Sequence, residues 1–524
     1  MTSNALPVRG TLLLLALLSA LLLFRLGQAP LLGPDEPRYA RVAVEMARRG
    51  DLVTPTLSGE PWLEKPALYY WLAGAGFRRL GETETAARLP SVAGALLLVG
   101  ATALVGARLY GGAAGLHAGF VLATSLLVFA YGRAAAMDML LAGTLTAGLG
   151  LIALRLAGIA GPLAIPFGHA LLGLAVLAKG PLGLLLPGLV VLAFLALTRQ
   201  WRFLRELFAP RALLAFAVVA LPWYLAVWRD QGQRFLDVFF LDHNLQRFTS
   251  TVHNHPGAFW YYLPVLLGGL FPWSGLVLAG LASLRPRASR SDLLVALWLA
   301  LPLAFFSMAG SKLPGYVLPC LPPLALLCGR VAARFEELRW QLPFWGRPRM
   351  VAVVGLVLGA VIGVAGPVAL QRLGDPAWTS ALTPCLWALL TGFAASRAFD
   401  ADLSAGLRVL RVGGAGLLLL LALVAPPLVA RHESGRELFR ETGGREVLAW
   451  GAWRTAWMSG YFYNDGHVRE IRGLDELGAA LQRGPTLVLC GPGQRRQLLG
   501  APGLAATLVA EGPRRNALFD VRAR

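Results

Sequence analysis

Charged residues are scarce in this 524-residue chain: they make up 15% of it, whereas hydrophobic residues make up 56%. Soluble proteins devote roughly a quarter of their residues to charge, so the composition excludes an ordinary soluble enzyme. Intrinsic disorder is excluded as well, because so apolar a chain cannot remain solvated. The composition therefore indicates a polytopic membrane protein.

Cysteine is also rare, and the four cysteines show no Cys-x-x-Cys spacing. Three of the four fall within apolar runs, so we interpret them as small core residues rather than as disulfide partners or metal ligands. The four positions are Cys320, Cys328, Cys385 and Cys490.

Acidic residues are too few to balance the basic ones: 29 Asp and Glu stand against 48 Lys and Arg, which gives a net charge of +19. A strongly basic chain suggests a nucleic-acid partner. No RNP, zinc-finger or helix-turn-helix pattern accompanies the charge, however, and the basic residues lie between apolar runs. We therefore expect a lipid bilayer around the chain and no nucleic-acid partner.

Long apolar runs are abundant. A membrane-spanning helix needs about 20 mostly apolar residues, and we predict about thirteen such spans in an all-α membrane region. The first run is interpreted as an anchor, because no small-residue cleavage site follows it. The predicted spans are 10–27, 86–107, 112–131, 135–154, 161–178, 180–198, 211–228, 261–284, 291–309, 314–333, 350–370, 377–396 and 409–430.

The arginines of the short loops predict the orientation. Lys and Arg are enriched in cytoplasmic loops, and a cytoplasmic N-terminus places the arginine-rich loops inside. It also places residues 28–85 and 229–260 on the outer face. Residues 431–524 follow the last span and contain runs such as Thr486–Cys490 between polar stretches. We therefore predict a membrane domain at 1–430 and a small extracytoplasmic α/β domain at 431–524.

Lysine is the rarest basic residue, since only Lys65, Lys179 and Lys312 occur in the chain. The predicted topology puts all three at outer ends of spans. This placement is either chance or a sign that three compact point charges meet an anionic group at the outer membrane face.

Four further segments on the predicted outer face carry ionisable residues. GPDEPRYA begins at Gly33, and we expect Asp35 to cap an amphipathic interfacial helix whose apolar stripe includes Tyr39 and Met46. Glu64 precedes Lys65, either as a surface ion pair or as part of a site. Asp138 lies at the outer start of a span, where Arg133 could pair with it. His243, His253 and His255 follow no standard zinc spacing.

These segments together resemble the bacterial lipid A aminoarabinose transferases of the GT-C superfamily, which also includes protein O-mannosyltransferases. The resemblance rests on DEPRYARVAVEMARRGDLVTP, GEPWLEKPALYYW, GRAAAMDM, LAVLAKGPLGLLLP, DHNLQRF, FWYYLP and SKLPGYVLPC. It covers nearly the whole chain. The sequence departs from the usual pattern at Pro37, at Ala40-Arg41 and around the single His243.

The resemblance implies a membrane glycosyltransferase of the bacterial inner membrane with a periplasmic C-terminal domain. The donor would be a sugar linked to a polyprenyl phosphate such as undecaprenyl phosphate, and the acceptor would be lipid A or another lipopolysaccharide component. Transfer to secreted proteins, as in protein O-mannosyltransferases, is the alternative. A transporter would carry its polar residues near the membrane midplane, and here they gather in outer loops.

The candidate site residues follow from that chemistry. Preorganised cations stabilise the charge that develops on the departing phosphate, and a carboxylate can orient or deprotonate the attacking group. The expected catalytic residues are Asp35, Glu36 and Asp138, and Tyr316 is expected to bind substrate. If a divalent metal is a cofactor, the expected ligands are Glu64, His243 and Asp242. The expected phosphate-binding residues are Lys65, Arg247, Arg38, Lys179 and Lys312.

Overall fold

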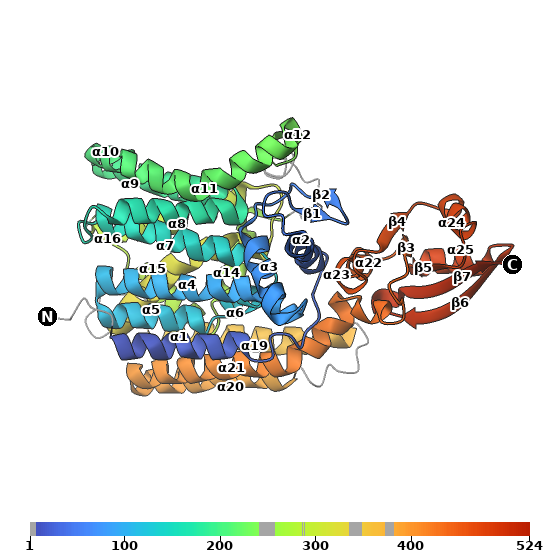
Figure 1. Cartoon of the computed structure of the whole chain (residues 1–524). Helices are drawn as coiled ribbons and strands as arrows, with labels where there is room; N and C mark the ends of the chain where they lie inside the picture. Colours follow the sequence, from blue (N-terminus) through green and yellow to red (C-terminus); the bar gives the residue numbers. More distant parts are fainter. Residues whose placement is uncertain (1–6, 240–256, 286, 288, 335–347, 373–381) are drawn as a thin grey trace.

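The computed structural model describes residues 7–239, 257–334, 348–372 and 382–524, except 286 and 288. Most of the described chain up to residue 433 forms a bundle of helices that run side by side (Figure 1). The bundle contains α1 (Val8–Leu23), α4 (Glu84–Tyr110), α5 (Gly112–Ala123), α6 (Leu126–Gly132), α7 (Asp138–Leu156), α8 (Ala164–Lys179), α9 (Leu182–Thr198), α11 (Pro210–Gln231), α14 (Tyr262–Gly269), α15 (Ser274–Ala282), α16 (Arg290–Met308), α17 (Leu321–Ala333), α19 (Pro348–Arg372), α20 (Leu382–Ala401) and α21 (Leu403–Glu433).

Every predicted span overlaps at least one of these helices. Within the described residues, six helices are long and apolar enough to cross a membrane, or eight if each of two bent pairs counts as one span. The helices α1, α8 and α9 are also apolar but only 16 or 17 residues long. The structure therefore supports a helical membrane region, while the count of thirteen stays a prediction.

Two predicted straight spans are bent in the structure. The run at 112–131 divides into α5 and α6, which meet at 63°. The run at 261–284 divides at 115°, between the segment Phe259–Gly269 and α15. Pro272 lies in this second break, where it has no N–H to continue a helical hydrogen-bond ladder.

Small residues allow the helices to approach closely. A Cβ added at Gly94 of α4 would lie 2.6 Å from the Met139 carbonyl oxygen of α7, and one added at Gly143 would lie 2.3 Å from the Gly94 carbonyl oxygen. Apolar helices in a membrane associate through this kind of close backbone packing. The α4–α7 contact matters for the site, because α7 begins at Asp138.

Short elements connect the bundle helices. In the described part of the chain between α9 and α14 they are η1 (Trp201–Phe203), α10 (Leu204–Leu207), α12 (Gln233–Leu236) and η3 (Phe259–Tyr261). Segment η4 (Pro314–Cys320) precedes α17.

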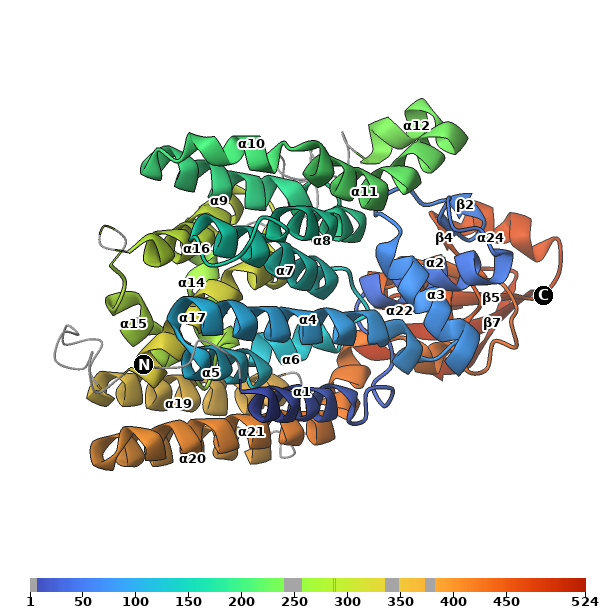
Figure 2. The ribbon, with the colours of Figure 1, turned by 60° about the vertical axis from the view of Figure 1, so that its left-hand side comes forward.

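The segment between α1 and α4 crosses one end of the bundle. It contains α2 (Asp35–Arg49), the short antiparallel pair β1 (Thr56–Leu57) and β2 (Glu60–Pro61), and α3 (Leu68–Leu80). Figures 1 and 2 both place α2 and α3 at the end of the bundle that faces the C-terminal sheet. Helix α1 begins toward the opposite end (Figure 1).

The C-terminal residues form a five-stranded sheet in the order β4-β3-β5-β7-β6. Strand β3 is parallel to β4 and β5, and β7 is antiparallel to β5 and β6. The apolar run at 486–490 forms β5, and its last four residues are buried. The strands are β3 (Val447–Trp450), β4 (Val468–Ile471), β5 (Thr486–Cys490), β6 (Leu504–Glu511) and β7 (Ala517–Ala523), and the helices are η7 (Arg436–Phe439), α22 (Arg454–Met458), α23 (Gly460–Tyr463), α24 (Leu474–Leu481), α25 (Pro492–Gly500) and η8 (Pro513–Arg515).

This sheet has core residues on both faces. That arrangement is typical of a small α/β unit. That residues 431–524 form a separate extracytoplasmic domain stays a prediction.

Candidate active site

Helix α2 forms as predicted, but its first residue is not its cap. The N-cap position belongs to Pro34, which makes no side-chain cap hydrogen bond, and Asp35 is the first helical residue. The expected capping role of Asp35 is therefore wrong, because its carboxylate is instead paired with Arg38 one turn along. The predicted apolar stripe is confirmed, since Tyr39 and Met46 are both buried.

Glu36 is buried beside Asp35 and is fully engaged by the protein. Its carboxylate accepts hydrogen bonds from the Leu32 N–H, the Ala135 N–H and the Arg88 guanidinium, at 2.8–2.9 Å. Arg88 is 2% exposed and also donates to three backbone carbonyls just before α2. These bonds fix the position of the Glu36 carboxylate, and the catalytic role expected for it stays a prediction.

Arg38 points to the side of α2 that carries Asp35. Its guanidinium lies 5.3 Å from the Trp62 ring centre, a cation–π distance. Burial alone would lower the pKa of Arg38, but the charge of Asp35, with smaller contributions from Tyr39 and Glu64, raises it. The Asp35 side chain is 49% exposed, so this carboxylate remains accessible while its partner stays charged.

Lys65 directly follows Glu64 in the sequence and is buried, with 8% of its surface exposed. Its ammonium donates to the Glu64 carbonyl oxygen at 3.2 Å. Burial, followed by the negative charge of Glu64, raises the pKa of Tyr70, which places Glu64 near that phenol as well as near Arg38. We call Asp35, Arg38, Glu64 and Lys65 the arginine cluster.

A second group surrounds the start of α7. The Lys179 ammonium at the end of α8 donates to the Asp138 carboxylate at 2.6 Å and lies 5.0 Å from the centre of the Tyr316 ring. Gly315 packs directly against this ion pair, because a Cβ there would lie 2.9 Å from Asp138 Oδ1. We call Asp138, Lys179, Gly315 and Tyr316 the lysine cluster.

Of the two roles that the sequence left open for Asp138, pairing with Arg133 or orienting the site, the pairing with Arg133 is not found. Arg133 instead donates to the carbonyl oxygens of Leu21, Leu22, Phe24 and Arg25 around the end of α1. Carbonyls at a helix C-terminus lack helical partners, so a guanidinium with several donors is well suited to bind them. Lys179 takes the place of Arg133 beside Asp138.

Lys312 lies just before η4, which contains Tyr316. Its side chain is buried, and the ammonium donates to the Ala309 carbonyl oxygen at 2.6 Å. The neighbouring Ser311 hydroxyl is buried and has no hydrogen-bond partner among the residues that the structure describes. It is therefore a polar group to which substrate could bond.

Both clusters lie at the same end of the bundle. Helix α3, which follows Lys65, packs against α8, which ends at Lys179. The segment η4 in turn packs against α7. The sequence prediction that Lys65, Lys179 and Lys312 share one end of the molecule therefore agrees with the structure, whereas their binding of a phosphate is untested.

Three predicted site residues, Arg247, Asp242 and His243, lie outside the described residues. The structure therefore says nothing of the proposed metal site beyond Glu64. Within the described ranges, no group of three or more His, Cys, Asp or Glu side chains is arranged to hold a metal ion.

The C-terminal region packs against α2, a contact that no sequence pattern predicted. Arg41 and Arg48 of α2 both pair with Asp465, which lies two residues after the end of α23. The Tyr463 hydroxyl donates to Glu84 at 3.0 Å and accepts from the Leu31 N–H at 2.7 Å. These partners are more than 370 positions apart, so no local sequence pattern could have indicated them.

Comparisons with known proteins show what the chain is similar to. Residues 64–225, which include Lys65, Asp138 and Lys179, match the family described as dolichyl-phosphate-mannose-protein mannosyltransferase. Two undecaprenyl phosphate-alpha-4-amino-4-deoxy-L-arabinose arabinosyl transferases are similar in sequence. The protein from Edwardsiella ictaluri is 35% identical over 306 residues, and the one from Pseudomonas aeruginosa is 37% identical over 342 residues.

These sequence matches cover 56% and 63% of this chain, and 54% and 61% of the relatives' own lengths. A structural comparison extends further. The crystal structure of ArnT from Cupriavidus metallidurans bound to undecaprenyl phosphate superposes with a TM-score of 0.77 at 24% identity, over 98% of both chains. The two chains share one fold.

The shared fold includes the part of the chain that the sequence matches leave out. Because the superposition covers 98% of this chain, it extends over the C-terminal sheet as well as the bundle. The fold itself does not determine which molecules bind, so the assignment of a reaction depends on the site residues.

Proposed function

We propose that this protein is a membrane glycosyltransferase that moves a sugar from a polyprenyl phosphate to lipid A or another lipopolysaccharide component, with 4-amino-4-deoxy-L-arabinose as the sugar. One observation carries the proposal: segments that carry buried or half-buried cations pack together at one end of an apolar helical bundle. The phosphate of a membrane-bound donor would lie at that level. The names of the similar arabinosyl transferases support the choice of sugar and donor.

The proposed chemistry follows from burial and charge. As the sugar leaves, negative charge grows on the lipid phosphate. Cations fixed in a site with little water stabilise such charge more strongly than cations in bulk solvent. Lys65 and Lys312 are 8% and 7% exposed, and Arg38 and Lys179 complete the set, with Arg247 as a further candidate. Their combined effect would stabilise the departing phosphate.

Asp35 is the proposed base or orienting group for the acceptor. All three carboxylates are paired with a cation, but the Asp35 side chain is 49% exposed, whereas those of Glu36 and Asp138 are 10% and 19% exposed. Tyr316 would bind substrate beside Lys179. If a divalent metal takes part, Glu64 with Asp242 and His243 would hold it.

The membrane arrangement is part of the proposal. Residues 1–430 would cross the bacterial inner membrane about thirteen times from a cytoplasmic N-terminus, and residues 431–524 would lie in the periplasm. The site would then lie at the outer face, where both the donor and the acceptor lipid can reach it.

Reconstitution tests the proposal. The purified chain in liposomes is given undecaprenyl-phosphate-linked aminoarabinose and lipid A, and the product is identified by mass spectrometry. Transfer by the unaltered chain, abolished in Asp35→Asn, is the expected result. Lack of transfer from any lipid-linked sugar by a correctly inserted protein would overturn it.

A second candidate is transfer of mannose to secreted proteins, which the family match over residues 64–225 favours. The same liposomes, supplied with polyprenyl-phosphate-linked mannose and a serine- and threonine-rich peptide, distinguish the two. Glycosylated peptide together with unmodified lipid A would support this second function in place of the first.

A further inference from the structure

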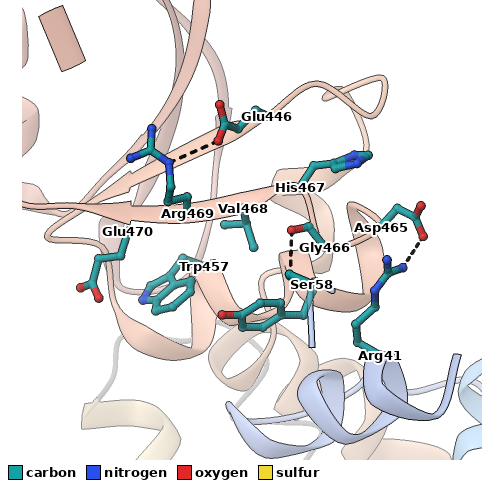
Figure 3. Close-up of a pocket in the computed structure, with 11 residues that line it drawn as sticks. Arg41, Ser58, Glu446, Trp457, Asp465, Gly466, His467, Val468, Arg469 and Glu470 are labelled. Carbon is teal, nitrogen blue, oxygen red and sulfur yellow. Dashed lines mark hydrogen bonds and ion pairs between the residues drawn. The ribbon is translucent and has the colours of Figure 1, made fainter. Parts of the chain in front are cut away.

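A cavity of about 650 Å³ lies between α2 and the C-terminal sheet. Arg41 and Ser58 line it from the N-terminal side, and the remaining lining residues come from 446–470 (Figure 3). The residues that line this cavity have no role in the proposed reaction. Its volume is within the range of small-molecule sites.

The lining combines aromatic rings with charged groups. The rings of Trp457 and Tyr461 have centres 5.8 Å apart and are inclined at 53° to each other. Figure 3 shows Trp457 beside Glu470, with Val468 next to it. Aromatic faces pack against the C–H surface of a sugar ring, and carboxylates and guanidinium groups hydrogen-bond to its hydroxyls. A saccharide needs both kinds of group at once.

The charges of the lining disfavour a phosphate. Two arginines and three carboxylates line the cavity. Each arginine already has an acidic partner: Arg41 pairs with Asp465 and Glu45, and Arg469 pairs with Glu446 at 3.3 Å. An anionic ligand would therefore meet an excess of negative charge, whereas neutral hydroxyl groups or an amino group would not.

The cavity adjoins the arginine cluster. Helix α23, which contains Tyr461, packs against α2. Burial raises the pKa of Tyr461, and the positive charge of Arg38 acts in the opposite direction, so this phenol lies within electrostatic range of Arg38. Arg41, on the cavity wall, is one helical turn from Arg38. A molecule in the cavity would lie beside the proposed reaction centre.

We propose that this cavity binds the saccharide portion of the acceptor, through the ring faces of Trp457 and Tyr461 and the carboxylate of Glu470, and that it does not bind the acceptor's phosphates. The proposal rests on the proposed function only in naming the acceptor. Binding of a saccharide is a property that can be measured without any transfer.

Calorimetry with the full chain in nanodiscs tests it. The probe is a deacylated, dephosphorylated core oligosaccharide from lipopolysaccharide, and no donor is added. We expect saturable binding, weakened about tenfold in Glu470→Gln and in Tyr461→Leu, because each variant removes a direct ligand contact. Glu470 is exposed, so its replacement by Gln should leave folding intact.

Two variants outside the cavity serve as controls. Glu441→Gln changes another exposed carboxylate, and Trp453→Leu changes an aromatic residue whose ring packs on Arg514; both should bind the oligosaccharide normally. No binding, or equal binding by all variants, would overturn the proposal. So would preferential binding of inorganic phosphate that is lost in Arg469→Gln. Binding by a chain that transfers no sugar would refute the proposed function alone.

Discussion

The acidic residues of the site differ in what surrounds them. This difference distinguishes a carboxylate that can reach substrate from one that stabilises the fold. Asp35 and Glu36 are neighbours in the sequence, yet one carboxylate is half exposed and the other is enclosed by two N–H groups and Arg88. The sequence indicated both residues as catalytic candidates. It could not distinguish them, because the groups that enclose Glu36 include Arg88 and Ala135, which are distant in the sequence. A pair of substitutions should separate the two roles.

Replacing Asp35 with Asn should reduce transfer by about 10²-fold or more, since positioned acid–base groups contribute on that scale. Thermal stability should change little, because the side chain is half exposed. Initial rates in liposomes and the unfolding midpoint measure both effects. Glu60→Gln, an exposed carboxylate of the same segment, is the matched control and should retain full activity.

Replacing Glu36 with Ala should instead destabilise the protein. It leaves the Arg88 guanidinium buried without its charge partner, a change that costs about 3–5 kcal/mol in buried pairs. The expected result is a lower unfolding midpoint in detergent, accompanied by loss of activity. An unchanged midpoint together with abolished transfer would show that Glu36 acts chemically.

At the scale of elements, packing between segments places the candidate residues. The apolar stripe of α2 was predictable from its periodicity. The apolar run at 486–490 was apparent from the sequence, but its place as the central strand β5 was not. The Asp138–Lys179 pair could not be predicted from the sequence. It forms because the first residue of α7 lies beside the last residue of α8. The bend between α14 and α15 was not predicted either, because residues 261–284 form one continuous apolar run in the sequence.

Gly315→Ala tests the packing of η4 against α7. The added methyl group would lie 2.5 Å from Tyr131 Cε1 and 2.9 Å from Asp138 Oδ1, so the lysine cluster must shift. We expect transfer to fall at least tenfold, as displacement of a positioned group by about 1 Å can cost more than this. Gly188→Ala is the control, because a Cβ there meets open space; it should leave the rate unchanged.

At the scale of the whole molecule, the C-terminal region holds the segment between α1 and α4 in place. Asp465 binds Arg41 and Arg48, and Arg436 and Tyr463 bind Glu84 at the start of α4. Composition predicted a small α/β unit after the last span, but could not predict that it rests on α2. Such long-range contacts depend on how the complete chain folds.

The Asp465 contacts make this junction sensitive to acid. Burial alone would raise the pKa of Asp465, but the hydrogen bonds and charges of Arg41 and Arg48 lower it below its ordinary value of about 3.9. The stabilisation from ionised Asp465 is therefore present above about pH 4 and is lost as the pH falls through the lowered pKa.

Unfolding midpoints of the unaltered chain and Asp465→Asn check this dependence. The variant should be less stable at neutral pH, and the difference should shrink as the pH falls through the lowered pKa of Asp465, because the unaltered side chain is then protonated as well. Asp475→Asn, in the first turn of α24, provides a control that should show no such convergence. A constant difference at all pH values would contradict the assignment.

The bond between the Leu31 amide and the Tyr463 hydroxyl joins positions 432 apart in the chain. During synthesis, the first membrane helix and α2 leave the ribosome long before their last supporting contacts exist. In a nascent chain, Leu31 and the α2 residue Arg41 therefore lack these partners until the residues up to 465 have emerged and folded.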